Sequence, residues 1–301
     1  MFLTRYSRSL NQSRLRVRSW KETRVNYLEI YEVGKGILAS AGIDSPDTDA
    51  FYLMQHVFHI NRGQLLVDPL KKAEPALGRA YLDLIRKRSE RIPCQYLIGS
   101  TEFMGLTFKV NPSVLIPRQD TETLVEEVIR IIPSEAKVLD MCTGSGCIGI
   151  SVKCFLHNVD MTLSDISEEA LRVAEENAEL QGVEVRTVCS DLFENIDGRF
   201  DVILSNPPYV TDEEYASLMP EVRDYEPRLA LTAGQDGLDI YRRIAKEVPS
   251  HLNAEGWLIM EIGCSQADAV RALLEAEGFE DIRIVKDLAG LDRVVVSRLY
   301  R

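Results

Sequence analysis

The second half of the chain alternates two hydrophobic patterns. Short, nearly continuous apolar runs predict buried strands at 137–141, 159–164, 184–189, 200–205, 256–262, 281–286 and 292–299. Between these runs, apolar residues recur every three or four positions and predict helices at 121–131, 147–156, 168–181, 237–252 and 265–278. Strands separated by helices of this length form parallel β-α-β units with right-handed crossovers. The pattern therefore predicts an α/β fold with a doubly wound, mostly parallel sheet.

The first third of the chain follows a helical pattern instead. Apolar residues recur at helical spacing up to about residue 92, as in Ala50, Leu53, Val57 and Ile60. Further on, β-branched and aromatic residues interrupted by glycines predict a linker followed by a hairpin that joins two domains. We therefore expect a basic, disordered extension, a small helical domain, the linker with its hairpin and the α/β domain, at residues 1–24, 25–92, 93–116 and 117–301.

Composition and charge limit the classes of partner. Of the 301 residues 45% are hydrophobic, and no stretch approaches the ~18–20 apolar residues of a membrane span. The chain has 35 Lys and Arg against 47 Asp and Glu, a net charge of -12. Nucleic-acid backbones are bound by Lys and Arg that displace counterions, so this balance disfavours them. We expect a monomer with no direct nucleic-acid partner and no membrane partner.

The cysteines and histidines indicate neither disulfides nor a metal. No C-x-x-C pair and no zinc-type spacing occurs, which is typical of reduced thiols in a reducing compartment. We expect a cytoplasmic protein. His56 and His59 could share a metal on one helix face, but no second pair of ligands accompanies them, so we expect no metal. The six cysteines are Cys94, Cys142, Cys147, Cys154, Cys189 and Cys264.

The first 24 residues differ from the rest of the chain, because they carry seven basic side chains and one acidic side chain. An Arg-rich, acid-poor amino terminus can be an organelle transit peptide. It can also be a disordered basic arm, or the result of a start codon assigned upstream of the true one near Val25. We favour the last two together, since "VNYLEIYEVGKGIL" already has the pattern of a first helix.

A glycine loop follows the first predicted strand of the α/β domain. In "KVLDMCTGSGCIGIS" (137–151), Gly144, Gly146 and Gly149 form a G-x-G-x-x-G between a strand and a helix. Such glycines let a ligand approach the backbone at the first switch point of the sheet. Asp165 lies 19 residues after Gly146, at the position of an acid that binds ribose hydroxyls. The loop indicates a nucleoside-containing ligand, either a dinucleotide or S-adenosylmethionine.

Two carboxylates near this loop have alternative roles. Asp165 could instead cap the helix that begins near Glu168. Asp191, which closes the next strand, could accept a hydrogen bond from an adenine amino group or could be a surface carboxylate. We favour the ribose role for Asp165.

The stretch "SNPPYV" (205–210) ends the strand at 200–205, where open α/β sheets bind ligands. Proline has no N–H, so this segment presents carbonyl acceptors with few donors. The Asn206 side-chain oxygen and the Pro207 carbonyl could hold the two N–H donors of a planar –NH₂ group, while Tyr209 offers its ring as a wall. A rigid turn is the alternative. We interpret the segment as a site because it follows a nucleoside loop.

A planar –NH₂ beside a nucleoside favours methyl transfer from a sulfonium over hydride transfer. The protein would align nitrogen, methyl and sulfur at ~3–3.5 Å and exclude water. An amide nitrogen is a poor nucleophile, and two acceptors on its protons would raise its electron density as charge develops. No general base is required by this scheme.

At these residues the sequence resembles the class I S-adenosylmethionine-dependent methyltransferases with the signature (N/D)PP(Y/F). From about residue 25 onward it looks most like the protein-(glutamine-N5) methyltransferases that modify the Gly-Gly-Gln glutamine of peptide chain release factors. The stretch "LIPRQDTE" (115–122) carries more of this resemblance than the tetrapeptide, which adenine-N6 methyltransferases share. The resemblance implies a seven-stranded Rossmann-like sheet with an antiparallel last strand, and a helical domain that docks the release factor.

The resemblance also implies roles for single residues. Cofactor contacts would come from Cys142, Thr143, Gly144, Ser145, Gly146, Asp165, Asp191, Leu192 and Asn206. The substrate glutamine would be held by Asn206, Pro207, Pro208 and Tyr209, with Arg118, Thr121 and Glu122 in the adjoining wall. Of these, Asn206, Pro207 and Tyr209 would be catalytic. The sequence departs from the family at Cys142, where a glycine is common, and at Gln119, where proline is usual.

Other functions fit parts of the sequence. An adenine-N6 nucleic-acid methyltransferase would use the same tetrapeptide on a flipped base, although the acidic composition speaks against it. A dinucleotide-dependent oxidoreductase has support only from the glycine loop and Asp165. A non-catalytic adaptor would have no need of two amide acceptors at Asn206 and Pro207.

Overall fold

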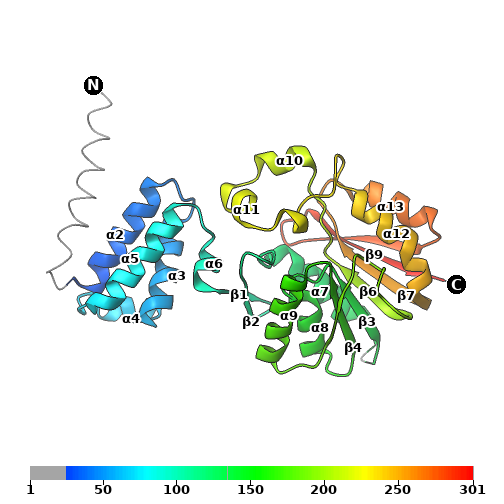
Figure 1. Cartoon of the computed structure of the whole chain (residues 1–301), viewed down its shortest axis with the longest axis horizontal. Coiled ribbons are helices and arrows are strands. Elements are labelled where there is room, and N and C mark those ends of the chain that lie inside the picture. The colour runs from blue at the N-terminus through cyan, green and yellow to red at the C-terminus, as the bar shows by residue number, and fades with distance from the viewer. Residues whose placement is uncertain (1–24, 134, 301) are drawn as a thin grey trace. The chain divides into compact units, whose positions relative to one another are not determined.

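The computed structural model describes residues 25–133 and 135–300, and the chain divides into two compact units, Met1–Ile98 and Gly99–Arg301 (Figure 1). The basic segment 1–24 lies outside the described residues. No helix in the described parts of the chain has the length and apolarity needed to cross a bilayer.

The first unit is helical. Asn26 begins its first helix with a capping box, in which its side chain accepts from Glu29 N and its own N–H is bound by the Glu29 carboxylate. Ala50, Leu53 and Ile60 are buried, as their spacing predicts. Part of the segment expected to be a linker, Cys94–Ile98, forms a short helix that belongs to this unit. The helices are α2 (Tyr27–Ser40), α3 (Pro46–Phe58), α4 (Arg62–Val67), α5 (Pro75–Ser89) and α6 (Cys94–Ile98).

The second unit contains a seven-stranded sheet in the order β5-β4-β3-β6-β7-β9-β8. Pairing is parallel from β5 to β7, while β9 runs antiparallel to both of its neighbours. The predicted doubly wound, mostly parallel sheet with an antiparallel last strand is confirmed. The strands are β3 (Lys137–Met141), β4 (Asp160–Asp165), β5 (Arg186–Cys189), β6 (Phe200–Ser205), β7 (Leu252–Glu261), β8 (Glu280–Lys286) and β9 (Asp292–Leu299).

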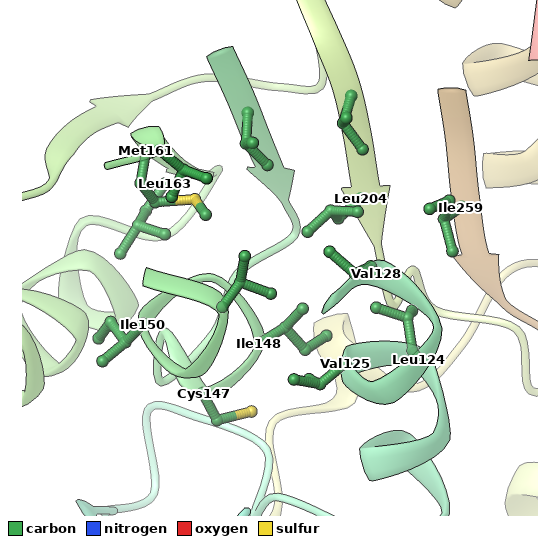
Figure 2. Packing of buried hydrophobic residues seen from close by; sticks show 14 of the residues in the cluster. Leu124, Val125, Val128, Cys147, Ile148, Ile150, Met161, Leu163, Leu204 and Ile259 are labelled. Carbon is green, nitrogen blue, oxygen red and sulfur yellow. The ribbon is translucent and has the colours of Figure 1, made fainter. Parts of the chain in front are cut away.

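Alternate residues of each central strand enter two separate cores. On β6, Val202 and Leu204 pack under α7 (Glu122–Ile131), α8 (Cys147–Phe155) and α9 (Glu168–Gln181), as Figure 2 shows for Leu204. Ile203 points to the opposite face, under α12 (Asp239–His251) and α13 (Ala267–Ala276). Since both faces are covered, the central strands carry apolar residues on both sides, which is why they appear in the sequence as nearly continuous apolar runs.

The predicted hairpin is formed by β1 (Ser100–Phe103) and β2 (Leu106–Lys109), and it belongs to the second unit. Phe103 and Phe108 pack into the core beneath α7 and α8. The buried Asn177 side chain accepts from Lys109 N (2.6 Å) and donates to Lys109 O (3.0 Å) and Ser145 O (2.9 Å). One amide thus ties the hairpin to the glycine loop.

Three short elements between β6 and α12 were not predicted: α10 (Asp212–Ser217), α11 (Pro220–Tyr225) and the 3₁₀ turn η3 (Arg228–Ala230). Local signals for them exist, because Thr211 and Glu214 form a capping box and Pro220 occupies the first turn of α11. No residue of α10 is buried, and the only buried residue of α11 is Glu221, so both helices lack the apolar periodicity on which the prediction depends. A further turn, η2 (Gln119–Thr121), precedes α7.

Candidate active site

A cavity of about 380 Å³ opens at the carboxyl ends of β3, β4 and β6 in the second unit. Eleven of the residues expected from the sequence line it: Arg118, Thr121, Cys142, Thr143, Gly144, Ser145, Asp165, Asp191, Leu192, Asn206 and Pro208. Four do not: Gly146, Glu122, Pro207 and Tyr209. Segments far apart in the sequence therefore meet at one end of the sheet.

Each of the three glycines in the loop is explained by a different feature of its backbone or its surroundings. Gly144 has φ +54°, and a Cβ there would meet nothing within 4 Å, so this position leaves open space in the cavity wall. Gly146 has φ +80°, and a Cβ would lie 2.6 Å from Ile150 Cδ1. At Gly149 a Cβ would lie 2.4 Å from Leu163 Cδ2, so this glycine allows α8 to pack closely on β4.

Cys142 occupies a backbone conformation that favours glycine, with φ +59°. Its side chain lines the cavity, and burial raises the pKa of the thiol to about 12. The thiol is therefore protonated near neutral pH and acts as a small apolar group in the cavity wall.

Asp140 supports the loop from below and is fully buried. Its Oδ2 accepts from Thr143 Oγ1 (2.6 Å) and Gly149 N (2.9 Å), whereas its Oδ1 has no partner among the described residues. Burial raises the pKa of Asp140 to about 7, against the effect of both hydrogen bonds. The carboxyl group thus holds the loop in shape without lining the cavity.

Asp165 ends β4 and faces the cavity. Its Oδ2 accepts from Gly144 N (2.9 Å) and its Oδ1 from Ser167 N (3.0 Å). The alternative role as a helix cap belongs to Ser167, whose Oγ accepts from Ala170 N (3.1 Å). Burial raises the pKa of Asp165, and the N–H donors oppose that shift. The carboxylate lines the cavity and could also accept from hydroxyl groups of a ligand.

Asp191 and Leu192 line the far side of the cavity. Asp191 Oδ1 forms an ion pair with Arg243 Nη2 (2.9 Å), a residue of α12 that the sequence did not suggest. Leu192 is buried and has φ +49°. Arg243 also lines the cavity, and no sequence motif surrounds it that could have revealed this position.

The Asn-Pro-Pro-Tyr segment follows β6, and its Asn206 and Pro208 line the cavity. The Asn206 Nδ2 donates to Thr121 Oγ1 (3.4 Å), while Pro207 is buried beneath the segment. The Tyr209 Oη donates to Glu261 Oε1 (3.2 Å), and Tyr209 O accepts from Gln266 Nε2 (3.0 Å). Tyr209 therefore lies outside the lining of this cavity, and none of the described residues that line it is aromatic.

The opposite wall is held by Glu226, which the sequence did not single out. The Arg118 Nη2 pairs with Glu226 Oε1 (2.5 Å), and Ile116 N donates to Glu226 Oε2 (3.1 Å). The next residues, Pro227, Leu229 and Ala230, line the cavity. This ion pair fastens the apolar wall after α11 to the segment before η2.

Glu122 and Gln119 lie outside the cavity lining. The Glu122 Oε1 accepts from Met104 N (2.6 Å) at the turn of the hairpin, and Gln119 is exposed in η2. Glu122 thus orients the hairpin in this structure.

Comparison with known proteins identifies the family. Residues 119–221 match the Methyltransferase small domain, and residues 29–99 match the PrmC N-terminal domain. The release factor glutamine methyltransferase of Geobacter sulfurreducens is 41% identical over 266 residues, 88% of this chain and 94% of that protein. The chain belongs to the release factor glutamine methyltransferase family. The relative of that name from Clostridium acetobutylicum is 41% identical over 256 residues, 83% of this chain and 90% of that protein.

A solved methyltransferase structure from Pyrococcus furiosus shares the fold of this family member. It is 17% identical, covers 71% of this chain and 99% of that chain, and gives a TM-score of 0.52. In the described parts of this family member no group of three or more His, Cys, Asp or Glu could hold a metal ion, and all six cysteines are free.

Proposed function

We propose that this protein transfers a methyl group from S-adenosylmethionine to the side-chain nitrogen (N5) of the glutamine in the Gly-Gly-Gln motif of peptide chain release factors. The observation that carries the proposal is that Asn206 lines the same cavity as Asp165 and the glycine loop, in a chain of this family. The names of the relatives favour a glutamine over an adenine as the methyl acceptor.

The cavity has the donors and acceptors that S-adenosylmethionine requires. Asp165 offers its carboxylate to ribose hydroxyls, and the open side of Gly144 admits the ligand close to the backbone. Ile166 and Leu192 provide apolar surface for the adenine, next to Asp191. The cofactor supplies an electrophilic methyl group on a positively charged sulfur.

Asn206 and Pro207 would hold the acceptor amide. Because Thr121 takes the Asn206 Nδ2–H, the Asn206 Oδ1 is left to accept from the substrate. The Pro207 carbonyl is the second acceptor we propose, since two adjacent prolines provide no competing N–H. With both amide hydrogens accepted, the nitrogen gains electron density toward the methyl group and then releases one proton to solvent.

We assign the docking of the release factor to the helical unit, Met1–Ile98. In and after α4, Leu66, Val67 and Leu70 are exposed large apolar side chains that suit contact with a protein partner. The net charge of -12 supports a protein substrate bound without direct contact to nucleic acid. We propose that the protein acts as a monomer.

The test is mass spectrometry of a purified release factor after incubation with this protein and S-adenosylmethionine. We expect a gain of one methyl on the Gly-Gly-Gln glutamine. Asn206→Ala should lower the rate about 10–100-fold, since a lost polar partner costs ~1–3 kcal/mol, while cofactor affinity is retained. A methyl found instead on adenine in a parallel nucleic-acid reaction would contradict the proposal.

A further inference from the structure

We infer that Glu226 is a specificity-determining residue, because it neutralises the Arg118 cation in the cavity wall and so lets the cavity prefer the charged methyl donor to its uncharged product. This inference rests on the proposed function, since it takes the cavity as the site of S-adenosylmethionine. Methyl transfer breaks the bond between sulfur and the methyl carbon and leaves the electron pair on sulfur. The sulfonium cation becomes a neutral thioether, S-adenosylhomocysteine, so the two ligands differ by a methyl group and a positive charge.

The cations that line the cavity are each paired with a carboxylate. Among the described lining residues, Arg118 and Arg243 are the only Lys, Arg or His side chains. The Arg118 Nη2 lies 2.5 Å from Glu226 Oε1, and the Arg243 Nη2 lies 2.9 Å from Asp191 Oδ1. The described part of the wall therefore presents no unpaired cation to a ligand.

Arg118 belongs to the end of the cavity where we propose that the methyl acceptor binds. Asn206, the proposed acceptor-binding residue, donates to Thr121 Oγ1 (3.4 Å), which follows Arg118 in the same segment. All three residues line the cavity. The sulfonium must face this end, because the methyl group has to lie between the sulfur and the acceptor nitrogen. A charge on Arg118 therefore acts on the charged part of the cofactor.

Burial makes Glu226 an effective counter-charge. Its side chain has an exposed fraction of 2%, against 37% for Arg118, so the carboxylate lies behind the wall while Arg118 lines the cavity. Its Oε2 also accepts from Ile116 N (3.1 Å), so each oxygen has a donor. Charges in a protein interior act more strongly on each other than charges in water, because the effective dielectric constant is lower. Loss of the Glu226 charge would thus leave an unpaired cation beside the sulfonium.

A purely structural role of Glu226 predicts a different result from a role of its charge. Glu226 fastens the wall residues that follow it to the segment before η2, and loss of this link would loosen the site for both ligands. Both affinities would then change in the same direction. An unpaired cation repels only the sulfonium, so it changes the ratio of the two affinities. The dissociation constant of S-adenosylhomocysteine divided by that of S-adenosylmethionine, the selectivity ratio, separates the two explanations.

The test is calorimetric titration of S-adenosylmethionine and of S-adenosylhomocysteine into the full-length protein. Glu226→Gln should lower the selectivity ratio about 4–20-fold, the effect of a unit charge at roughly 10 Å and an effective dielectric constant of ~20–40. Glu127→Gln is the matched control, because Glu127 is a buried carboxylate that pairs with Arg283 (2.6 Å) and lies outside the cavity lining. It should keep the selectivity ratio of the wild type.

Arg118→Gln tests the sign of the effect and does not depend on the folding of Glu226→Gln. It leaves the carboxylate without its cation, so the selectivity ratio should rise, opposite to the change in Glu226→Gln. The double variant should return close to the wild-type ratio. An unchanged ratio in Glu226→Gln, or an unchanged or lower ratio in Arg118→Gln, would overturn the inference. Wild-type protein that binds both ligands but does not methylate a release factor would refute the proposed function instead.

Discussion

The Oδ2 of Asp165 accepts a hydrogen bond from the backbone N–H of Gly144 (2.9 Å), 21 residues earlier in the chain. This bond joins the ends of β4 and β3, so the residue expected to bind ribose also shapes the loop expected to surround the ligand. The carboxylate therefore supports the loop besides the ribose-binding role that we propose for it, and a substitution there should alter both the loop and the binding of the cofactor.

Asp165→Ala should weaken the binding of S-adenosylmethionine. The loss of hydrogen bonds to a charged acceptor costs ~1.5–3 kcal/mol, which raises the dissociation constant about 10–100-fold. Calorimetric titration of the purified variants measures this change. Asp160→Asn is the control, because Asp160 is exposed at the other end of the same strand and should leave the affinity unchanged. Equal affinities of Asp165→Ala and the wild type would remove Asp165 from the site.

Asp140 should make the stability of the protein fall as the pH rises from about 4 to about 7. Its pKa is raised from 3.8 to about 7 in the folded state, so the folded protein binds more protons than the unfolded chain within this window. The stabilisation of the folded state by proton binding to Asp140 is complete below the pKa of the unfolded chain. It is lost as the pH rises through the folded-state pKa, and the loss is on the order of a few kcal/mol. Asp140→Asn should lack this dependence.

Urea denaturation of the wild type and Asp140→Asn at a series of pH values tests the effect of Asp140. Subtraction of the two curves removes the titration of groups that both proteins share. As the pH rises, we expect the free energy of unfolding of the wild type to fall relative to that of Asp140→Asn. Parallel curves would show that Asp140 is ionised in the folded state throughout this range.

Cys142 should tolerate glycine better than alanine. At φ +59° a side chain costs ~1–2 kcal/mol, so Cys142→Gly should have a higher free energy of unfolding than Cys142→Ala by about 1 kcal/mol. Within α8 the order should reverse, with Cys154→Ala more stable than Cys154→Gly by roughly 0.5–1 kcal/mol. Thermal or urea unfolding measures both pairs, and the same order at both sites would contradict the prediction.

Gly149→Ala should destabilise the second unit. The new Cβ would lie 2.4 Å from Leu163 Cδ2 and 3.0 Å from Asp140 Cβ, and such overpacking costs ~1–3 kcal/mol. Gly36→Ala provides the contrast, since that glycine is exposed in α2 with nothing within 4 Å of its Cβ position. It should stabilise by about 0.4–1 kcal/mol. Measurement of the free energies of unfolding of both variants and the wild type tests this prediction. A Gly149→Ala variant as stable as the wild type would contradict it.

Local pattern predicted the regular elements well because both faces of the sheet are covered. The ranges predicted for β3, β6 and α9 agree with the structure, since turn or capping residues bound these apolar segments sharply. At β7 the strand begins at Leu252, four residues before the predicted start at 256. There, Phe200 pairs with Leu252 across an irregular register, so pairing with β6 extends the strand through polar residues.

The sequence by itself determined the alternating elements, the glycine loop, the Asn-Pro-Pro-Tyr segment and the carboxylate of Asp165, because each depends on residues close together in the chain. Only the tertiary structure decided that Glu226 holds Arg118, that Arg243 pairs with Asp191, and that Glu261 lies behind Tyr209. These pairs lie between 52 and 108 residues apart. A buried charge reveals its partner only when the fold has brought the two side chains together, since no local pattern of hydrophobic and polar residues encodes such a distance.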